Sequence, residues 1–270
     1  MGFDFDEEGF MTERYLELEK DTADLFQSQF EIATIINQDC HVLLISPSIH
    51  RDDKTEIIVS TLLSRALEHY QGTIIMARRQ MVAAASVTLR ALLEVTFRIQ
   101  AIANNPDSIE DFLSEDIQFR QKSANKLRHT SDPILASVRA KITDEMVESL
   151  KEEIRAAGSR QRTTEHWAKL AGMEAFYVAH YTILSSAVHT KPHDLDTYLI
   201  VDDNNRITGL KYAHSVEKIP DLILASSGII LTAAHAFDTV FNCGFSNREE
   251  ELRALIRDAY DDMERDRVPS

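Results

Sequence analysis

The segment at residues 81–103 constrains the fold most, because apolar side chains surround it on most sides when it is drawn as a helix. A helix of this kind is buried only when it has neighbours on several sides, so the chain needs a multi-helix core. Glycine and proline, which punctuate turn-rich β folds, number only 8 and 6 in 270 residues. We therefore expect an all-α protein, a multi-helix bundle with buried central helices.

Apolar residues recur at three- and four-residue steps along most of the chain, the pattern of amphipathic helices. The expected helices cover residues 12–45, 52–76, 81–103, 107–128, 173–189, 220–242 and 246–268, and two shorter ones begin at residues 132 and 143. We expect the helices at 173–189 and 220–242 to be buried, and the polar helix at 107–128 to lie outside. A β-branched and aromatic pattern with a polar centre predicts one small hairpin near 197–212.

The domain organisation is less constrained, because 270 residues fit one large domain or two small ones. No linker long enough to force a boundary is present. We expect residues 1–270 to form a single helical domain, with peripheral helices at 1–50, a core at 52–243 and a charged C-terminal helix at 246–268.

The remaining composition favours the cytoplasm and gives no sign of a membrane or a cofactor. Cys40 and Cys243 are far apart and lack metal-ligand spacing, and the acidic N-terminus does not resemble a signal peptide. The apolar stretch at 222–237 is shorter than the roughly 18 residues of a membrane span and is expected to be a buried helix, in which His235 is a core histidine. Histidines cluster between residues 166 and 193, but without the HExxH pattern, so we predict no metal site and no cofactor.

Charge is distributed unevenly along the chain. The net charge of −15 opposes non-specific binding to nucleic acid or anionic membranes, because such binding depends on Lys and Arg. Residues 1–24 carry a net −7, whereas residues 120–169 carry +4. The basic segment is either a binding face or an ordinary solvated helix surface, and the acidic ends could engage a basic protein partner.

Two polar stripes lie on helices that are otherwise apolar. Each consists of side chains four residues apart, which places them on one helix face: Ser86, Arg90, Glu94 and Arg98 in the first, and Tyr177, Tyr181, Ser185 and His189 in the second. Buried charge needs partners, so the two stripes are expected to face each other or a groove.

A site built from these stripes would combine anion binding with proton transfer. Arg90 or Arg98 would bind a phosphate, His189 would carry a proton, and Glu94 would orient either group, with Tyr181 and Ser185 supplying hydroxyls. The competing interpretation is a structural network that only fixes helix packing.

A second pattern places Arg160 and Arg162 shortly before His166. This resembles the Arg-x(4–6)-His motif of HEPN-type helical ribonucleases. The resemblance implies that His166 moves a proton during attack by an RNA 2′-hydroxyl, while Arg160 or Arg162 stabilises the phosphate. The sequence places the motif across a loop, and its spacing also arises by chance.

A broader resemblance spans residues 70–198. The run Leu89-Arg90-Ala-Leu-Leu-Glu94, the segment containing Trp167, and Tyr181-Thr-Ile-Leu-Ser185-Ser-Ala-Val-His189 resemble the bacterial family known as domain of unknown function 5677. The resemblance implies a helical protein without an assigned activity. It marks Arg90, Glu94, Tyr181, Ser185 and His189 as the positions to test.

These observations lead to two functional hypotheses. The first is a homo-oligomeric protein that handles a small phosphorylated ligand or cleaves RNA without a metal, in a toxin or phage-defence setting that only the HEPN-like motif suggests. The second is a non-enzymatic helical module for binding, regulation or oligomerisation, in which the polar stripes are structural.

Overall fold

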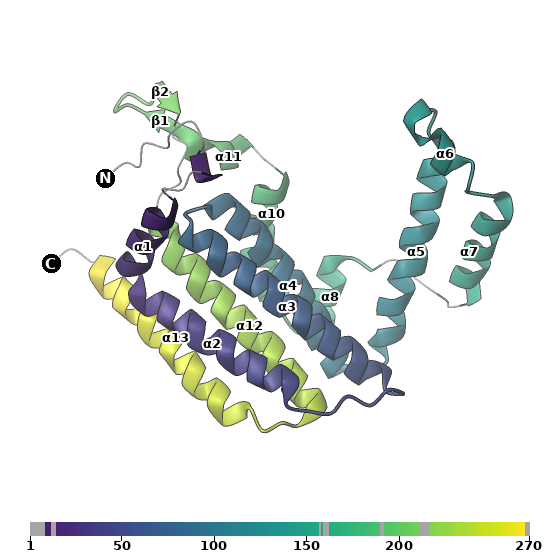
Figure 1. Ribbon diagram of the computed structural model, residues 1–270, viewed down its shortest axis with the longest axis horizontal. Helices are drawn as coiled ribbons and strands as arrows, with labels where there is room; N and C mark the ends of the chain where they lie inside the picture. The colour runs from purple at the N-terminus through teal and green to yellow at the C-terminus, as the bar shows by residue number, and fades with distance from the viewer. Residues whose placement is uncertain are drawn as a thin grey trace.

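The computed structural model describes residues 9–11, 15–156, 158, 162–189, 192–210 and 216–267. It is a bundle of long helices from which a helical arm projects on one side (Figure 1). A two-stranded antiparallel hairpin lies at one end of the bundle. The prediction of an all-α protein with buried central helices and one small hairpin is confirmed.

Most of the long helices lie in the first half of the chain and near its C-terminal end, with shorter segments between them. The α-helices are α1 (Tyr15–Leu25), α2 (Gln27–Ile45), α3 (Lys54–Arg78), α4 (Val82–Asn104), α5 (Ser108–His129), α6 (Ala136–Arg139), α7 (Asp144–Ala156), α8 (Thr164–Leu170), α9 (Glu174–Phe176), α10 (Thr182–His189), α11 (Pro192–Leu195), α12 (Ile219–Phe241) and α13 (Ser246–Arg267). The strands are β1 (Leu199–Val201) and β2 (Ile207–Leu210), and short helical turns occupy Gly9–Met11, Pro133–Leu135, Tyr177–Tyr181, Asp196–Tyr198 and Val216–Lys218.

The core of the bundle is formed by α2, α3, α4 and α12. Helix α12 packs against the other three, and α13 covers α12 and α2 on the outside (Figure 1). Large side chains on α3, α4 and α12, including Leu63, Leu92, Phe97, Ile230 and Phe237, are fully buried. Burying each such side chain contributes roughly 1.5–3 kcal/mol, so these helices supply most of the apolar burial.

Tyr70 ties three of these helices together through a buried polar contact. Its hydroxyl donates to the Ala33 carbonyl of α2 at 3.0 Å and lies 3.0 Å from the Ser227 hydroxyl of α12. Burial raises the pKa of Tyr70, so the phenol stays protonated and can keep donating. This contact satisfies polar groups that would otherwise be left unpaired in the core.

The helix boundaries follow local chemistry. The Asp53 carboxylate accepts hydrogen bonds from the backbone N–H groups of Thr55 and Glu56 and so caps α3. At the end of α12, Asn242 adopts a left-handed conformation with φ 52°, and Gly244 two residues later is also left-handed, with φ 78°. Gly72 lies inside α3 without interrupting it, whereas the helix expected at 12–45 is divided at Phe26.

The helix predicted as buried at 173–189 is the clearest error. The chain forms the short α9, a π-helical turn at Tyr177–Tyr181 and then α10, and most of this segment is exposed. Of its apolar residues, Val178 and Ile183 are 69% and 68% exposed. Periodicity identified an apolar helix correctly, but only one side of this segment has α4 as a neighbour.

The arm consists of α5, α6 and α7, residues 108–156. At roughly 1.5 Å per residue, the 22 residues of α5 extend about 33 Å, and α7 folds back against α5 (Figure 1). A small separate cluster of Ala124, Val147 and Leu150 holds these two helices together. The polar helix expected outside the core is therefore present as α5, and it projects away from the bundle.

One helical stretch, Val216–Phe241, is long and apolar enough to cross a membrane. It is longer than the apolar stretch at 222–237 that was identified in the sequence. Within its most apolar part, 72% of the residues are buried inside the protein. This degree of burial is typical of the core helix of a folded bundle.

Candidate functional site

Helix α4 carries the first polar stripe on the side that faces α10 and α8. Arg90 and Glu94 lie one turn apart and form an ion pair, with Arg90 Nη2 3.0 Å from Glu94 Oε1. Their side chains are only 15% and 29% exposed, so the pair is partly shielded from water. The four-residue spacing on one helix face produces this pair directly.

The second polar stripe meets the first at Tyr181. Arg90 Nη2 donates to Tyr181 Oη at 2.6 Å, and the guanidinium carbon lies 4.7 Å from the centre of the Tyr181 ring. Tyr177 stacks on Tyr181 with ring centres 5.0 Å apart, and burial raises the pKa of Tyr177. The structure therefore brings Arg90, Glu94 and Tyr181 into one group, here called the Arg90 cluster.

The π-helical turn at Tyr177–Tyr181 contributes to this arrangement. In such a turn each N–H bonds to a carbonyl five residues back, and the Thr182 N–H accordingly donates to the Tyr177 carbonyl. The Thr182 hydroxyl donates to the same carbonyl at 3.3 Å. A regular helix would rotate the side chains differently, so the turn helps to set where Tyr181 meets Arg90.

Ser185 and His189 continue the second stripe away from the Arg90 cluster. Ser185 is partly buried, and His189, the last residue of α10, is exposed. Among the described residues, no hydrogen bond joins either of them to Arg90 or Glu94. His189 is thus accessible to a ligand, but it is not part of the contacts that hold Arg90.

Arg98 belongs to a different set of contacts at the base of the arm. Its Nη2 lies 3.4 Å from the Glu115 carboxylate, and its guanidinium is 5.9 Å from the Trp167 ring. The Trp167 indole N–H donates to Glu115 at 2.5 Å. The polar residues of the stripe on α4 therefore have different neighbours: Arg90 faces α10, and Arg98 faces α5 and α8.

Two residues of the HEPN-like motif, Arg162 and His166, lie near the same base. Arg160 is outside the described residues. Arg162 pairs with Asp111 through Nε at 2.9 Å and Nη2 at 2.7 Å. His166 packs edge-on against Trp167, and its Nε2 is shielded from solvent with no hydrogen-bond partner in the described part of the chain. His166 is therefore packed within α8, and Arg162, just before α8, is paired with α5.

His69 on α3 is a residue that the sequence reasoning missed. Burial lowers its pKa, Arg65 lowers it further, and Glu68 and Glu94 act in the opposite direction. His69 is therefore close enough to Glu94 to sense its charge. The four-residue spacing of Arg65 and His69, which places both on one face of the helix that precedes α4, could have identified His69 from the sequence.

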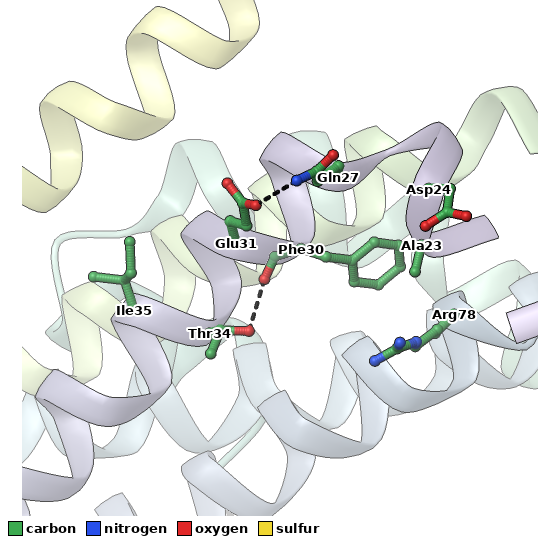
Figure 2. Close-up of a pocket in the computed structure, with 8 residues that line it drawn as sticks. All are labelled: Ala23, Asp24, Gln27, Phe30, Glu31, Thr34, Ile35 and Arg78. Atoms are coloured by element: carbon green, nitrogen blue, oxygen red, sulfur yellow. Dashed lines mark hydrogen bonds between the residues drawn. The ribbon is translucent and has the colours of Figure 1, made fainter. Parts of the chain in front are cut away.

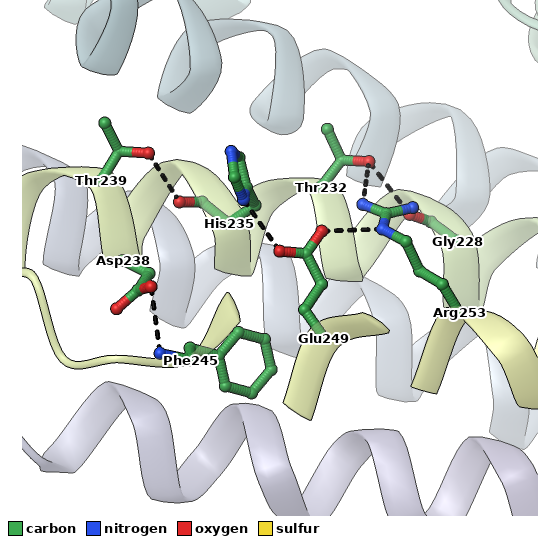
Figure 3. A network of polar contacts seen from close by, with 8 residues as sticks. All are labelled: Gly228, Thr232, His235, Asp238, Thr239, Phe245, Glu249 and Arg253. Carbon is green, nitrogen blue, oxygen red and sulfur yellow. Dashed lines mark hydrogen bonds and ion pairs between the residues drawn. The ribbon is translucent and has the colours of Figure 1, made fainter. Parts of the chain in front are cut away.

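A second polar network joins α12 to α13 (Figure 3). The Glu249 carboxylate accepts from His235 Nδ1 at 2.8 Å and from Arg253 Nε at 2.7 Å, and Arg253 also donates to Thr232. His235 is 50% exposed, so the expectation of a core histidine is wrong. Its side chain lies on the outer side of α12, where α13 leaves half of it uncovered.

Metal ligands are not grouped in the described part of the protein. No three His, Cys, Asp or Glu side chains there are placed to hold an ion. The side chains of His193 and Asp194, which belong to the histidine-rich segment, lie outside the described residues.

Comparison with known proteins identifies a family but no function. A model for the family of unknown function DUF5677 matches residues 56–207, which is more than half of the chain and includes every residue of the Arg90 cluster. The match stops before α12 and α13 and begins after α2. No curated protein and no solved structure matches the chain. The chain belongs to the family of unknown function DUF5677.

Proposed function

We propose that the Arg90 cluster binds a phosphate-bearing ligand, with RNA as the substrate class, and that His189 acts as the proton carrier. The contact between Arg90 and Tyr181 carries this proposal, because it joins the two polar stripes at a partly accessible place. Arginine is well suited to phosphate because its planar donors match the phosphate oxygens.

The hydrogen bonding of Arg90 leaves room for such a ligand. Its contacts with Glu94 and Tyr181 both use Nη2. Within the described residues, Nη1 has no hydrogen-bond partner, and Nε is buried without one. A phosphate oxygen at Nη1 would add a charge-assisted bond without displacing Tyr181.

His189 is the better placed of the two candidate histidines. It is exposed at the end of α10, whereas His166 Nε2 is shielded against Trp167. In metal-independent RNA cleavage, a histidine takes the proton of the attacking 2′-hydroxyl, and a protonated group returns one to the leaving 5′-oxygen. An exposed imidazole can exchange that proton with water.

The test is cleavage of a mixed single-stranded and transfer-RNA pool by the purified protein in EDTA. His189→Ala is expected to slow cleavage roughly 10²–10⁴-fold, the usual contribution of a general acid or base. His166→Ala, as the matched control, is expected to leave the rate unchanged. Loss of cleavage in His166→Ala alone would assign the chemistry to the HEPN-like motif instead.

Binding provides a second readout that separates a ligand site from a structural ion pair. Glu94→Gln removes the carboxylate that competes for Arg90, so it is expected to tighten binding of a short RNA, whereas Arg90→Ala weakens it. Equal loss of binding in both variants, together with lower stability, would indicate that the pair serves packing alone.

The alternative function is a non-enzymatic binding module. The projecting arm favours it, because an extended element with a small core of its own offers surface to a partner. Under this alternative, wild-type protein neither cleaves nor binds RNA, and partner binding depends on the arm.

A further inference from the structure

The outer part of the arm combines positive charge with exposed apolar side chains. Residues 119–141, here called the arm tip, contain six Lys and Arg residues and one Asp, a net charge of +5. Phe119 and Ile134 are 70% and 84% exposed. Arg120 and Arg128 pair with acids of the arm, while Lys126 and Lys141 are exposed without an ion pair in the described structure.

A groove with the opposite character lies on the far side of the bundle. It is formed by α1, α2 and the end of α3 and has a volume of about 500 Å³ (Figure 2). Phe30 and Ile35 contribute apolar surface, and Asp24 and Glu31 contribute carboxylates. Arg78 lies over the Phe30 ring at 5.9 Å.

The charge around this groove extends beyond its lining. Helices α1 and α2, residues 15–45, contain six acids and one Lys, a net charge of −5. Asp24 and Glu31 are exposed, and Glu31 accepts from the Gln27 amide at 2.7 Å without an ion pair in the described structure. Two carboxylates against one guanidinium leave the groove itself acidic.

We propose that the arm tip of one copy docks into the α1–α2 groove of a second copy. The two surfaces are opposite in charge, because the arm tip carries a formal +5 and helices α1 and α2 of the groove carry a formal −5, of which Glu19 and Asp39 pair with arginines outside these helices. Each surface also adds apolar side chains to its charged rim. The arm and the groove lie on opposite sides of the molecule (Figure 1), so one arm does not serve the groove of its own chain.

Local charge favours a second copy over nucleic acid as the occupant of the arm tip. The net charge of −15 opposes non-specific binding of a phosphate backbone, whereas the acidic helices of the groove in a second copy offer the arm tip an oppositely charged surface. Screening acts over about 8 Å at physiological salt, so the contact should weaken as salt rises. The proposal uses surfaces distant from the Arg90 cluster and does not depend on the proposed function.

The test is a charge exchange followed by sedimentation or light scattering at low and high salt. Lys126→Glu with Lys141→Glu, and separately Asp24→Lys with Glu31→Lys, are each expected to weaken self-association at least about tenfold, a change of roughly 1.4 kcal/mol. Combining all four substitutions restores the opposite charges and is expected to restore association. Arg155→Glu, on the arm but outside its tip, is the control and should change nothing.

Three outcomes would overturn the proposal. The first is a wild-type protein that is monomeric at all salt concentrations, and the second is an assembly that neither pair of substitutions weakens. The third is a combined variant that stays dissociated although its circular dichroism matches wild type. RNA retention that disappears only with the arm-tip substitutions, in a monomeric protein, would assign the tip to RNA instead.

Discussion

The bundle and the arm have similar helix content but very different amounts of buried apolar surface. In the bundle, α4 has neighbours on several sides, and Leu92, Leu93 and Phe97 are fully buried. In the arm, α5 and α7 share a cluster of three buried residues, and Phe119 points into solvent. Helical pattern alone therefore does not indicate how strongly a region resists unfolding.

This difference predicts two regions with separate stabilities. The free energy of opening a region rises with the apolar surface that opening exposes to water. When α7 separates from α5 while the bundle stays packed, only the small cluster between these two helices becomes exposed. We expect the arm to exchange backbone hydrogens through local opening, and the bundle to exchange them only through global unfolding.

The largest expected effect is that of Phe97→Ala in α4. Removing a fully buried phenyl ring leaves a cavity and should lower the free energy of unfolding by about 3–5 kcal/mol, measured by urea denaturation. Phe119→Ala is the matched control in the arm and should change it by less than about 0.5 kcal/mol. Similar decreases in the two variants would remove the proposed distinction.

Leu150→Ala should destabilise the arm without affecting the bundle. Leu150 is 8% exposed within the three-residue cluster, so its truncation should lower the opening free energy of the arm by about 2 kcal/mol. Hydrogen exchange should then accelerate in α7 and in the outer part of α5 that packs against it, and not in the bundle. Faster exchange throughout α3, α4 and α12 would show that arm and bundle unfold together.

Tyr70→Phe tests the polar contact inside the bundle. Loss of the hydroxyl leaves the Ala33 carbonyl and the Ser227 hydroxyl without their partner, at a cost of about 1–3 kcal/mol in unfolding free energy. Ser227→Ala keeps the bond to Ala33 and should cost less. The opposite order would mean that the contact with α12 is the more important one.

The smallest effect is the titration of His69. Because its folded pKa lies below 6.5, neutral His69 stabilises the fold fully above that pH, and the contribution is lost as pH falls through the folded pKa. Glu94→Gln should lower the pKa of His69 further, and Arg65→Gln should raise it, as measured by NMR. If the pKa of His69 were unchanged in Glu94→Gln, His69 would not be electrostatically coupled to the Arg90 cluster.

Much of the bundle could be predicted from sequence because its signals are local. The helices around Leu63, Phe97 and Ile230 are long and strongly apolar, and α3 has a clear capping residue in Asp53. The segment at 173–189 failed because periodicity shows that a face is apolar but not whether another element covers it. The break at Phe26 has no glycine or proline to mark it.

The site was predictable to the extent that it depends on helix spacing. The pairing of Arg90 with Glu94 follows from a four-residue step, whereas its contact with Tyr181 depends on how α10 packs on α4. The π-helical turn before α10 has no distinct sequence signal. The separation of Arg98 toward Glu115 likewise required knowledge of where the arm begins.

The position of α12 in the centre of the bundle has a consequence for synthesis of the chain. This helix packs against α2, α3 and α4 but leaves the ribosome long after them, by a delay on the order of ten seconds at ordinary elongation rates. During that interval the apolar faces that α12 will cover are exposed on the nascent chain. We expect the bundle to close only once α12 has left the ribosome, with transient protection of the exposed faces by a chaperone.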